Sequence, residues 1–237
     1  VDGNTLQLEQ VALIARTREA AALSPEAESA IDHSRSCLDS IVSSEAPVYG
    51  INTGFGIFAD RRIPRRDGAQ LSRNLILSHA VGAGPDLPGE VVRAAMLVRA
   101  NTLSKGFSGV RREIVQTMLD MLNTGVTPCV PSQGSLGSSG DLLQLSHMAL
   151  VLTAGEGENE AESGWAELNG EVLSGQEAMR RAGLKRIRLG PKEGLALNNG
   201  ATFSAAVGAL AVIDAEMLLD TADIALAMTL EAVLGCS

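Results

Sequence analysis

The chain contains 237 residues with a formal net charge of −9, long enough for one large domain or for one domain and part of another. Its basic residues never form a block longer than a pair, which argues against a surface for nucleic acid or anionic membrane. The individual apolar runs are too short and too interrupted to span a bilayer, and the first residues lack the pattern of a signal peptide. We therefore expect a soluble, cytoplasmic protein that acts on a small molecule and binds neither nucleic acid nor membrane.

The cysteines Cys37, Cys129 and Cys236 are odd in number, far apart and without CxxC spacing. Such a set predicts neither a disulfide framework nor a zinc site. Free cysteine commonly behaves as a small apolar residue, so ordinary thiols and no metal ion are expected.

Helical periodicity dominates the chain. Apolar residues recur near i, i+3, i+4 and i+7 in the segments 5–21, 24–44, 89–106 and 108–125. Ser24, which precedes Pro25, and Ser108 each predict a helix start. Gly106 and Gly125 predict helix ends. These segments indicate a mainly α protein.

Three further segments complete the expected structure. Residues 165–175 alternate apolar and polar side chains around Asn169-Gly170, which predicts a β-hairpin with a type I′ turn. The acidic stretch 155–164 reads as a solvated surface loop. The Ala-, Leu- and Val-rich stretch from Pro191 to Gly235 predicts one or two long, largely buried helices.

A first glycine cluster, "YGINTGFGIFAD", runs from Tyr49 to Asp60 and formally matches a dinucleotide fingerprint. A genuine fingerprint needs a preceding strand, a helix that opens within it, and an acid about 20 residues later, where this chain has Asn74. The cluster is better interpreted as a glycine-hinged loop that carries the only tyrosine, Tyr49. A plain turn in which Tyr49 merely packs remains the alternative.

A second cluster, "GSLGSSGD", runs from Gly134 to Asp141 and lacks the lysine of a phosphate-binding loop and the spacing of a nucleophile elbow. One interpretation makes it a cap on the helix that starts near Leu142. The other is chemical, because the unhindered Gly140 nitrogen can attack the Ser138 carbonyl. Ring closure with loss of water, and dehydration of Ser139, would convert the backbone itself into an electrophile.

Four motifs in order resemble the signatures of the aromatic amino acid ammonia-lyase family, and in particular those of its histidine-specific members. They are "VYGINTGFG" (48–56), "RNLILSHAVGAG" (73–84), "NTGVTPCVPSQGSLGSSGDLLQLSHMAL" (123–150) and "EGLALNNGATFSAA" (193–206). The resemblance implies a fumarase/aspartase-like helical fold, with an N-terminal domain over 1–190 that carries a prosthetic-group loop. Residues 191–237 would begin a central bundle of long helices, truncated relative to family members.

The resemblance also implies site residues. Ser138, Ser139 and Gly140 match the triplet that cyclises into 4-methylidene-imidazol-5-one, with Ser139 supplying the methylidene carbon; no soluble cofactor is implied. The acid that follows the triplet is Asp141. The family's catalytic base corresponds to Tyr49, a role that requires donors or positive dipoles near the phenol.

Two further positions match residues that contact the substrate or the ring. Asn199 resembles the asparagine that holds both the prosthetic group and the substrate. His79 stands where histidine-specific members carry histidine, and its ring can hydrogen-bond an imidazole. His147 lies inside the helix beyond the loop and is expected to be structural. Leu143-Gln144 depart from the family's usual Ala-Pro, which bears on the packing of the first helical turn.

The reaction implied is elimination of ammonia from L-histidine to give urocanate, after the substrate amino group adds to the methylidene carbon and Tyr49 removes a β-proton. A homotetramer with active sites shared among subunits is implied as well. Alternatives remain open. They are a phenylalanine or tyrosine ammonia-lyase or an aminomutase with the same prosthetic group, and an inactive fragment that acts only as a structural module.

Overall fold

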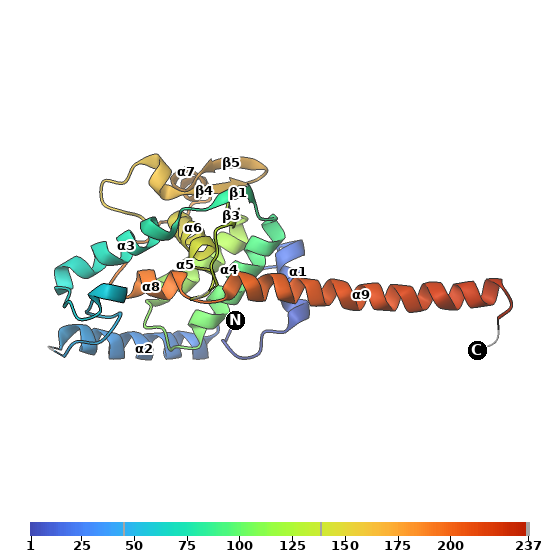
Figure 1. The fold of residues 1–237 in the computed structure, drawn as a ribbon, viewed down its shortest axis with the longest axis horizontal. Helices are drawn as coiled ribbons and strands as arrows, with labels where there is room; N and C mark the ends of the chain where they lie inside the picture. The colour runs from blue at the N-terminus through green and yellow to red at the C-terminus, as the bar shows by residue number, and fades with distance from the viewer. Residues whose placement is uncertain (45, 138, 236–237) are drawn as a thin grey trace.

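The computed structural model describes residues 1–44, 46–137 and 139–235, so Ser138 and Cys236 lie outside the described residues. Figure 1 shows a helical body from which one long helix projects. The α-helices are α1 (Leu8–Thr17), α2 (Pro25–Ser43), α3 (Gly68–His79), α4 (Gly89–Ser104), α5 (Arg112–Thr124), α6 (Leu142–Leu152), α7 (Gly175–Arg181), α8 (Glu193–Asn198) and α9 (Thr202–Ala232). The strands are β1 (Ala83–Asp86), β2 (Thr127–Pro128), β3 (Pro131–Gln133), β4 (Trp165–Leu168) and β5 (Glu171–Ser174), and the 3₁₀ turns are η1 (Gly56–Phe58), η2 (Arg65–Asp67) and η3 (Glu160–Ser163). The predicted mainly α class is confirmed.

Helix ends follow the sequence where the capping groups are local. Ser24 Oγ accepts a hydrogen bond from the Ala27 amide at 3.2 Å, and Pro25 occupies the first turn of α2. Gly125 caps α5 in the left-handed conformation. The predicted start at Ser108 is wrong, since α5 begins at Arg112. The Ser108 carbonyl instead accepts from the Lys192 ammonium, and the Gly109 amide donates to Ser34 Oγ of α2.

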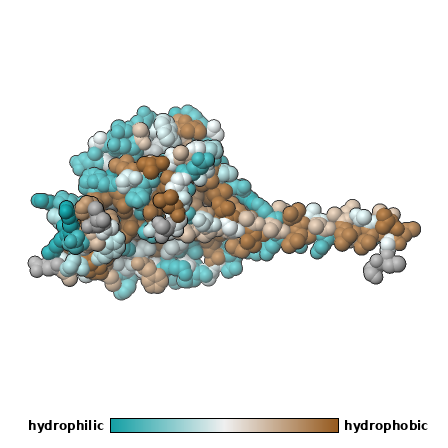
Figure 2. Space-filling view, viewed as in Figure 1, coloured by the Kyte–Doolittle hydropathy of each residue, from teal (hydrophilic) through white to brown (hydrophobic). Residues whose placement is uncertain are grey.

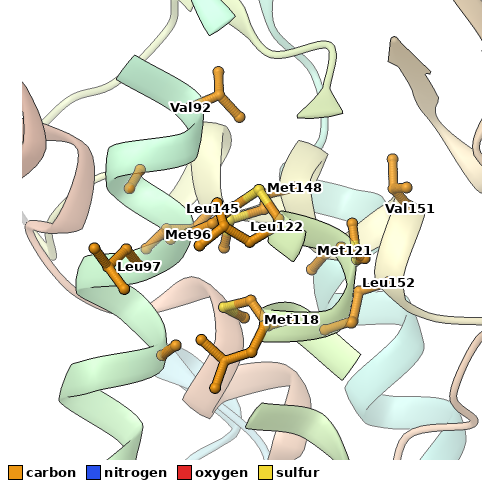
Figure 3. Packing of buried hydrophobic residues seen from close by; sticks show 14 of the residues in the cluster. Val92, Met96, Leu97, Met118, Met121, Leu122, Leu145, Met148, Val151 and Leu152 are labelled. Atoms are coloured by element: carbon orange, nitrogen blue, oxygen red, sulfur yellow. The ribbon is translucent and has the colours of Figure 1, made fainter. Parts of the chain in front are cut away.

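The core lies where α4, α5 and α6 meet, and Figure 3 shows their interlocking side chains. Each of these helices contributes fully buried residues, including Met96, Leu97, Met118, Leu119, Leu145 and Met148. Burial of such side chains is the main favourable contribution to folding. The core therefore anchors the N-terminal end of α6, which follows directly on the glycine loop.

Two small sheets frame this core. The predicted hairpin is confirmed as β4 and β5, with Asn169 and Gly170 both at positive φ, as a type I′ turn requires. Strand β2 adds to β4, and a separate antiparallel pair joins β1 to β3. The β1–β3 pair was not expected from the sequence, and it holds the chain just after α3 against the chain just before the glycine loop.

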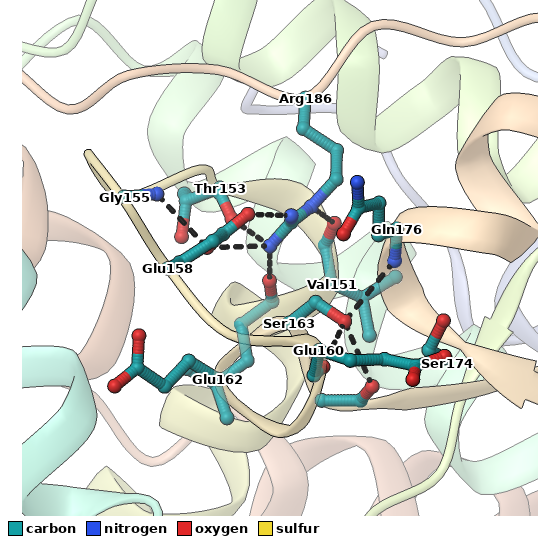
Figure 4. Close-up of polar contacts among 12 residues, drawn as sticks. Val151, Thr153, Gly155, Glu158, Glu160, Glu162, Ser163, Ser174, Gln176 and Arg186 are labelled. Atoms are coloured by element: carbon teal, nitrogen blue, oxygen red, sulfur yellow. Dashed lines mark hydrogen bonds and ion pairs between the residues drawn. The ribbon is translucent and has the colours of Figure 1, made fainter.

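The acidic loop is only partly a solvated one (Figure 4). Glu158 is nearly buried and forms ion pairs with Arg73, at 2.8 Å, and with Arg186. Arg186 also donates to the carbonyls of Leu150 and Thr153 at the end of α6. The expectation of a solvated role is therefore wrong for Glu158, whose partners lie far away in the sequence.

Helix α9 packs against α4 and α1 through its first turns, where Phe203, Ala206 and Leu210 are buried. Beyond Ile213 it is exposed and largely apolar, as the brown surface of the projecting arm in Figure 2 shows. The prediction of a largely buried helix is thus wrong for this part of α9, which the described residues of the chain leave uncovered. By length and composition alone α9 would suffice to cross a bilayer, but its first turns are part of the protein core.

The proposed division at residue 190 stays a prediction. Helix α8 packs on α3 and α6, and α9 begins against α4, so residues on both sides of this boundary share contacts.

Candidate functional site

A cleft of about 230 Å³ lies between the end of α3 and the glycine loop that leads into α6. The α3 side contributes Ser78, His79 and Val81, and the loop side contributes Ser139 and Gly140 among others. The first turn of α6 closes the cleft with leucine side chains. The structure therefore brings His79 to one cavity with Ser139 and Gly140, although the motif of His79 lies about sixty residues earlier in the sequence.

One nitrogen of the His79 ring contacts the backbone of its own helix. His79 Nδ1 lies 2.8 Å from the Leu75 carbonyl oxygen, one turn earlier in α3. A carbonyl only accepts, so Nδ1 carries the hydrogen of this contact, and Ser78 Oγ lies 3.1 Å from the same nitrogen. The contacts of Nδ1 leave Nε2 available for a ligand, as an acceptor in the neutral tautomer with its hydrogen on Nδ1.

The backbone at Gly140 is pressed against the turn that precedes α9. Gly140 forms a parallel bridge with Gly200, and the Asp141 amide donates to the Gly200 carbonyl at 2.8 Å. Gly140 has φ +89°, and a Cβ placed on it would lie 2.2 Å from the carbonyl carbon of Gly200. Only glycine fits such a position. Gly140 has no side chain to hinder its backbone nitrogen, and the neighbouring Ser139 lines the cleft. Both features are compatible with the backbone cyclisation that the motif implies.

Asp141 connects the glycine loop to α9. The residue is 5% exposed, and its two carboxylate oxygens accept from the Ser204 amide at 2.8 Å and from the Ser204 hydroxyl at 3.0 Å. Asp141 stands at the N-cap position of α6 but makes no capping bond there. The carboxylate instead caps an orphan amide in the first turn of α9. The interpretation of this acid as a cap for the helix near Leu142 is therefore corrected.

Asn199 lies at the end of α8 with an exposed side chain, and it does not line the cleft. Its carbonyl accepts a hydrogen bond from Arg99 Nη2 at 2.8 Å. Arg99 and Ser204 were not expected from the sequence. One signal was available for Arg99, because Met96, Arg99 and Leu103 share the helical spacing of the buried face of α4.

Tyr49 lies on its own loop, apart from the cleft lining. Its side chain is 61% exposed, its ring meets Phe55 edge-on, and its hydroxyl accepts from the Gly56 amide at 3.5 Å. The neighbouring Gly50 packs against Leu195 of α8, since a Cβ there would lie 2.9 Å from that side chain. The loop contains a single 3₁₀ turn and no α-helix over its described residues, in agreement with rejection of the dinucleotide motif.

His147 and the departures at Leu143-Gln144 have structural surroundings. His147 Nε2 accepts from the Gly82 amide at 3.1 Å, and burial lowers the pKa of its ring. This neutral imidazole holds the chain beside the cleft, in agreement with the structural role expected for it. Leu143 is buried against Gly82, while Gln144 is buried with its Oε1 unpaired among the described residues.

Comparison with known proteins follows the motifs. Residues 6–237 match the family model of the aromatic amino acid lyases. Histidine ammonia-lyase from Gloeobacter violaceus is 50% identical over 235 residues, which are 99% of this chain and 44% of that relative.

Solved structures agree in fold. Histidine ammonia-lyase from Trypanosoma cruzi superposes with a TM-score of 0.89 at 36% identity, over 100% of this chain and 45% of that one. A phenylalanine aminomutase from Pantoea agglomerans gives a TM-score of 0.84 at 35% identity, over 93% and 41% of the two chains. The chain spans less than half the length of these relatives. With its motifs, fold and family match in agreement, the chain belongs to the aromatic amino acid lyase family.

Proposed function

We propose that this chain carries the prosthetic-group part of an ammonia-lyase that converts L-histidine to urocanate. The observation that carries the proposal is the shared cleft of His79 and Ser139. With its hydrogen on Nδ1, a neutral His79 would accept through Nε2 from the N–H of an imidazole ring, which a phenyl ring lacks. The likeness to histidine ammonia-lyases at about half identity supports the same substrate.

The prosthetic group would form from Ser138, Ser139 and Gly140. The Gly140 nitrogen bonds to the Ser138 carbonyl carbon with loss of one water, and Ser139 loses its hydroxyl and α-hydrogen as a second water. The Ser138 side chain lies outside the ring atoms, so serine in place of alanine is compatible with closure. When formed, the group supplies an electrophilic carbon for the substrate amino group.

The remaining roles belong to side chains around the loop. Tyr49 would remove the β-proton of the substrate, and the Gly56 amide satisfies one acceptor site of its hydroxyl. Asn199 would hold the ring and the substrate. Asp141 would fix the loop through Ser204 and the first turn of α9. Helix N-termini beside the loop favour negative charge that develops there.

The exposed part of α9 supports a proposal about assembly. The exposed part of this helix carries apolar side chains, among them Met217, Leu218, Leu219, Ile224, Leu226 and Met228. An apolar surface of this length needs a covering partner. We infer a homotetramer with shared active sites, as the family resemblance implies, in the cytoplasm and without nucleic-acid or membrane partners.

A second enzyme function has a specific observation in its favour. The fold matches a phenylalanine aminomutase almost as closely as a histidine ammonia-lyase. The acceptor on His79 also suits the hydroxyl of tyrosine, so the substrate must be tested against both aromatic amino acids. An inactive fragment with a structural role is the non-enzymatic alternative.

The purified chain should be incubated with histidine, phenylalanine and tyrosine in turn. Release of ammonia with formation of urocanate is expected from histidine alone, and Ser139→Ala should abolish it. Turnover of phenylalanine or tyrosine but not of histidine would overturn the assignment of histidine as the substrate. A β-amino acid product would identify an aminomutase. No product from any of them, with the ring present, would identify a fragment that needs further chain.

His79→Leu provides a sharper test of specificity. Leucine keeps an apolar filling at the cleft but removes the acceptor, so KM for histidine should rise by about 10- to 100-fold. The mass of the loop peptide should stay that of the unsubstituted protein, because His79 takes no part in ring formation. An unchanged KM would contradict the role of His79.

A further inference from the structure

Arg99 is a buried cation whose partners among the described residues are carbonyls and a hydroxyl and not a carboxylate. It is 4% exposed, and its Nε has no hydrogen-bond partner in that part of the chain. Burial lowers the pKa of Arg99 to about 10, so its guanidinium is still charged near neutral pH. Burying a charge without a carboxylate partner is costly unless other acceptors hold it. Apolar packing of the core therefore does not explain this residue, and its hydrogen-bond partners must.

The guanidinium makes its contacts at the end of α8. Nη2 donates to the carbonyls of Ala196 and Asn199, and Nη1 contacts the Thr202 hydroxyl at 3.4 Å. Carbonyls at a helix C-terminus lack intrahelical partners and carry partial negative charge. A planar guanidinium can reach several of them at once, whereas a lysine ammonium is a single point charge.

The same turn holds the glycine loop. Gly200 has no side chain, and a Cβ there would lie 2.7 Å from Arg99 Nη1, so the guanidinium packs directly against its backbone. The carbonyl of the same Gly200 accepts from the Asp141 amide at 2.8 Å. The Arg99 side chain and the glycine loop are thus separated by one turn of backbone.

We propose that Arg99 is a positioning residue whose buried guanidinium holds the Asn199–Gly200 turn, which in turn fixes Gly140 and Asp141 for formation and use of the reactive loop. The part that concerns ring formation rests on the proposed function. The part that concerns the contacts from Arg99 through Gly200 to the Asp141 amide does not depend on the proposed function. Two readouts therefore separate the two claims.

The first readout is hydrogen exchange at the Asp141 amide. Arg99→Met removes the charge and both donors, and exchange at this amide should become about 10- to 100-fold faster. Amides in the middle of α5 should keep their exchange rates, whereas general destabilisation would accelerate both. Arg99→Lys should give an intermediate rate, and it keeps the test open if Arg99→Met fails to fold.

Arg93→Met is the matched control. Arg93 lies on the same helix, and its guanidinium also donates to a backbone carbonyl, that of Ala15 at the end of α1. This variant should leave exchange at Asp141 unchanged.

The second readout is the fraction of loop peptide that has lost two water molecules, followed by mass spectrometry after synthesis. Arg99→Met should accumulate the dehydrated peptide at least about tenfold more slowly than the unsubstituted protein and the Arg93→Met control. Asp141 exchange at the unsubstituted rate in a folded Arg99 variant would overturn the proposal. Unmodified peptide in the unsubstituted protein would instead refute the proposed function, and the exchange measurement would still decide the role of Arg99.

Discussion

Replacing Asp141 with alanine removes the carboxylate that ties the glycine loop to α9. Two hydrogen bonds from Ser204, at 2.8 and 3.0 Å, are lost, and the Ser204 amide is left without its partner. Hydrogen bonds to a charged group contribute about 1.5–3 kcal/mol each, and because these two share one carboxylate we expect a combined loss of about 3 kcal/mol. For a chain of this length, that loss lowers the melting temperature by roughly 10 °C.

The measurement is thermal unfolding of Asp141→Ala, Asp141→Asn and a control, Asp39→Ala. Asparagine retains one acceptor for the Ser204 amide and should lose only about 1 kcal/mol. Asp39 forms an exposed ion pair with Arg35 on α2, so its removal should cost less than about 0.5 kcal/mol. If Asp141→Ala melts within about 2 °C of Asp39→Ala, the carboxylate does not hold the loop on α9.

Three further predictions concern the rest of the fold. Glu158→Gln leaves the buried Arg73 and Arg186 without their carboxylate and should lower the free energy of unfolding in urea by about 3 kcal/mol. Glu160→Gln on the same loop should leave this free energy unchanged, and equal losses would contradict the ion pairs of Glu158. Partial burial raises the pKa of Cys129 to about 11, so at about pH 8 iodoacetamide should label exposed Cys37 before Cys129, and the reverse order would contradict this reasoning. The lowered pKa of His147 means that the unfolded chain binds a proton more readily, so stability should fall as pH drops below about 6.5, and this component should vanish in His147→Gln; an identical pH profile in the variant would refute it.

The parts of the fold that the sequence predicts are those with local causes. The start of α2 depends on Ser24 and Pro25, and the hairpin turn depends on Asn169 and Gly170, all within a few residues of the structure they define. Ser108 does not start α5, and its carbonyl instead accepts from Lys192, a residue far along the chain. A helical pattern carries no information about such a contact.

The candidate site divides in the same way. The triplet and its acid are visible as a motif, and the structure adds that Gly140 meets Gly200 and that Asp141 meets Ser204. These contacts join segments about sixty residues apart in sequence, so no local pattern predicts them. The roles assigned to Tyr49, His79 and Asn199 stay predictions that rest on the resemblance.

The central claim is that Ser138, Ser139 and Gly140 close into an electrophilic ring, and the mass of the loop peptide tests it most directly. The purified, folded chain should be cleaved and the peptide that contains residues 134–141 weighed, with Ser139→Ala as the control. The account predicts a peptide lighter by two water molecules in the unsubstituted chain and no methylidene in the control. A loop peptide of unmodified mass in folded protein would contradict it.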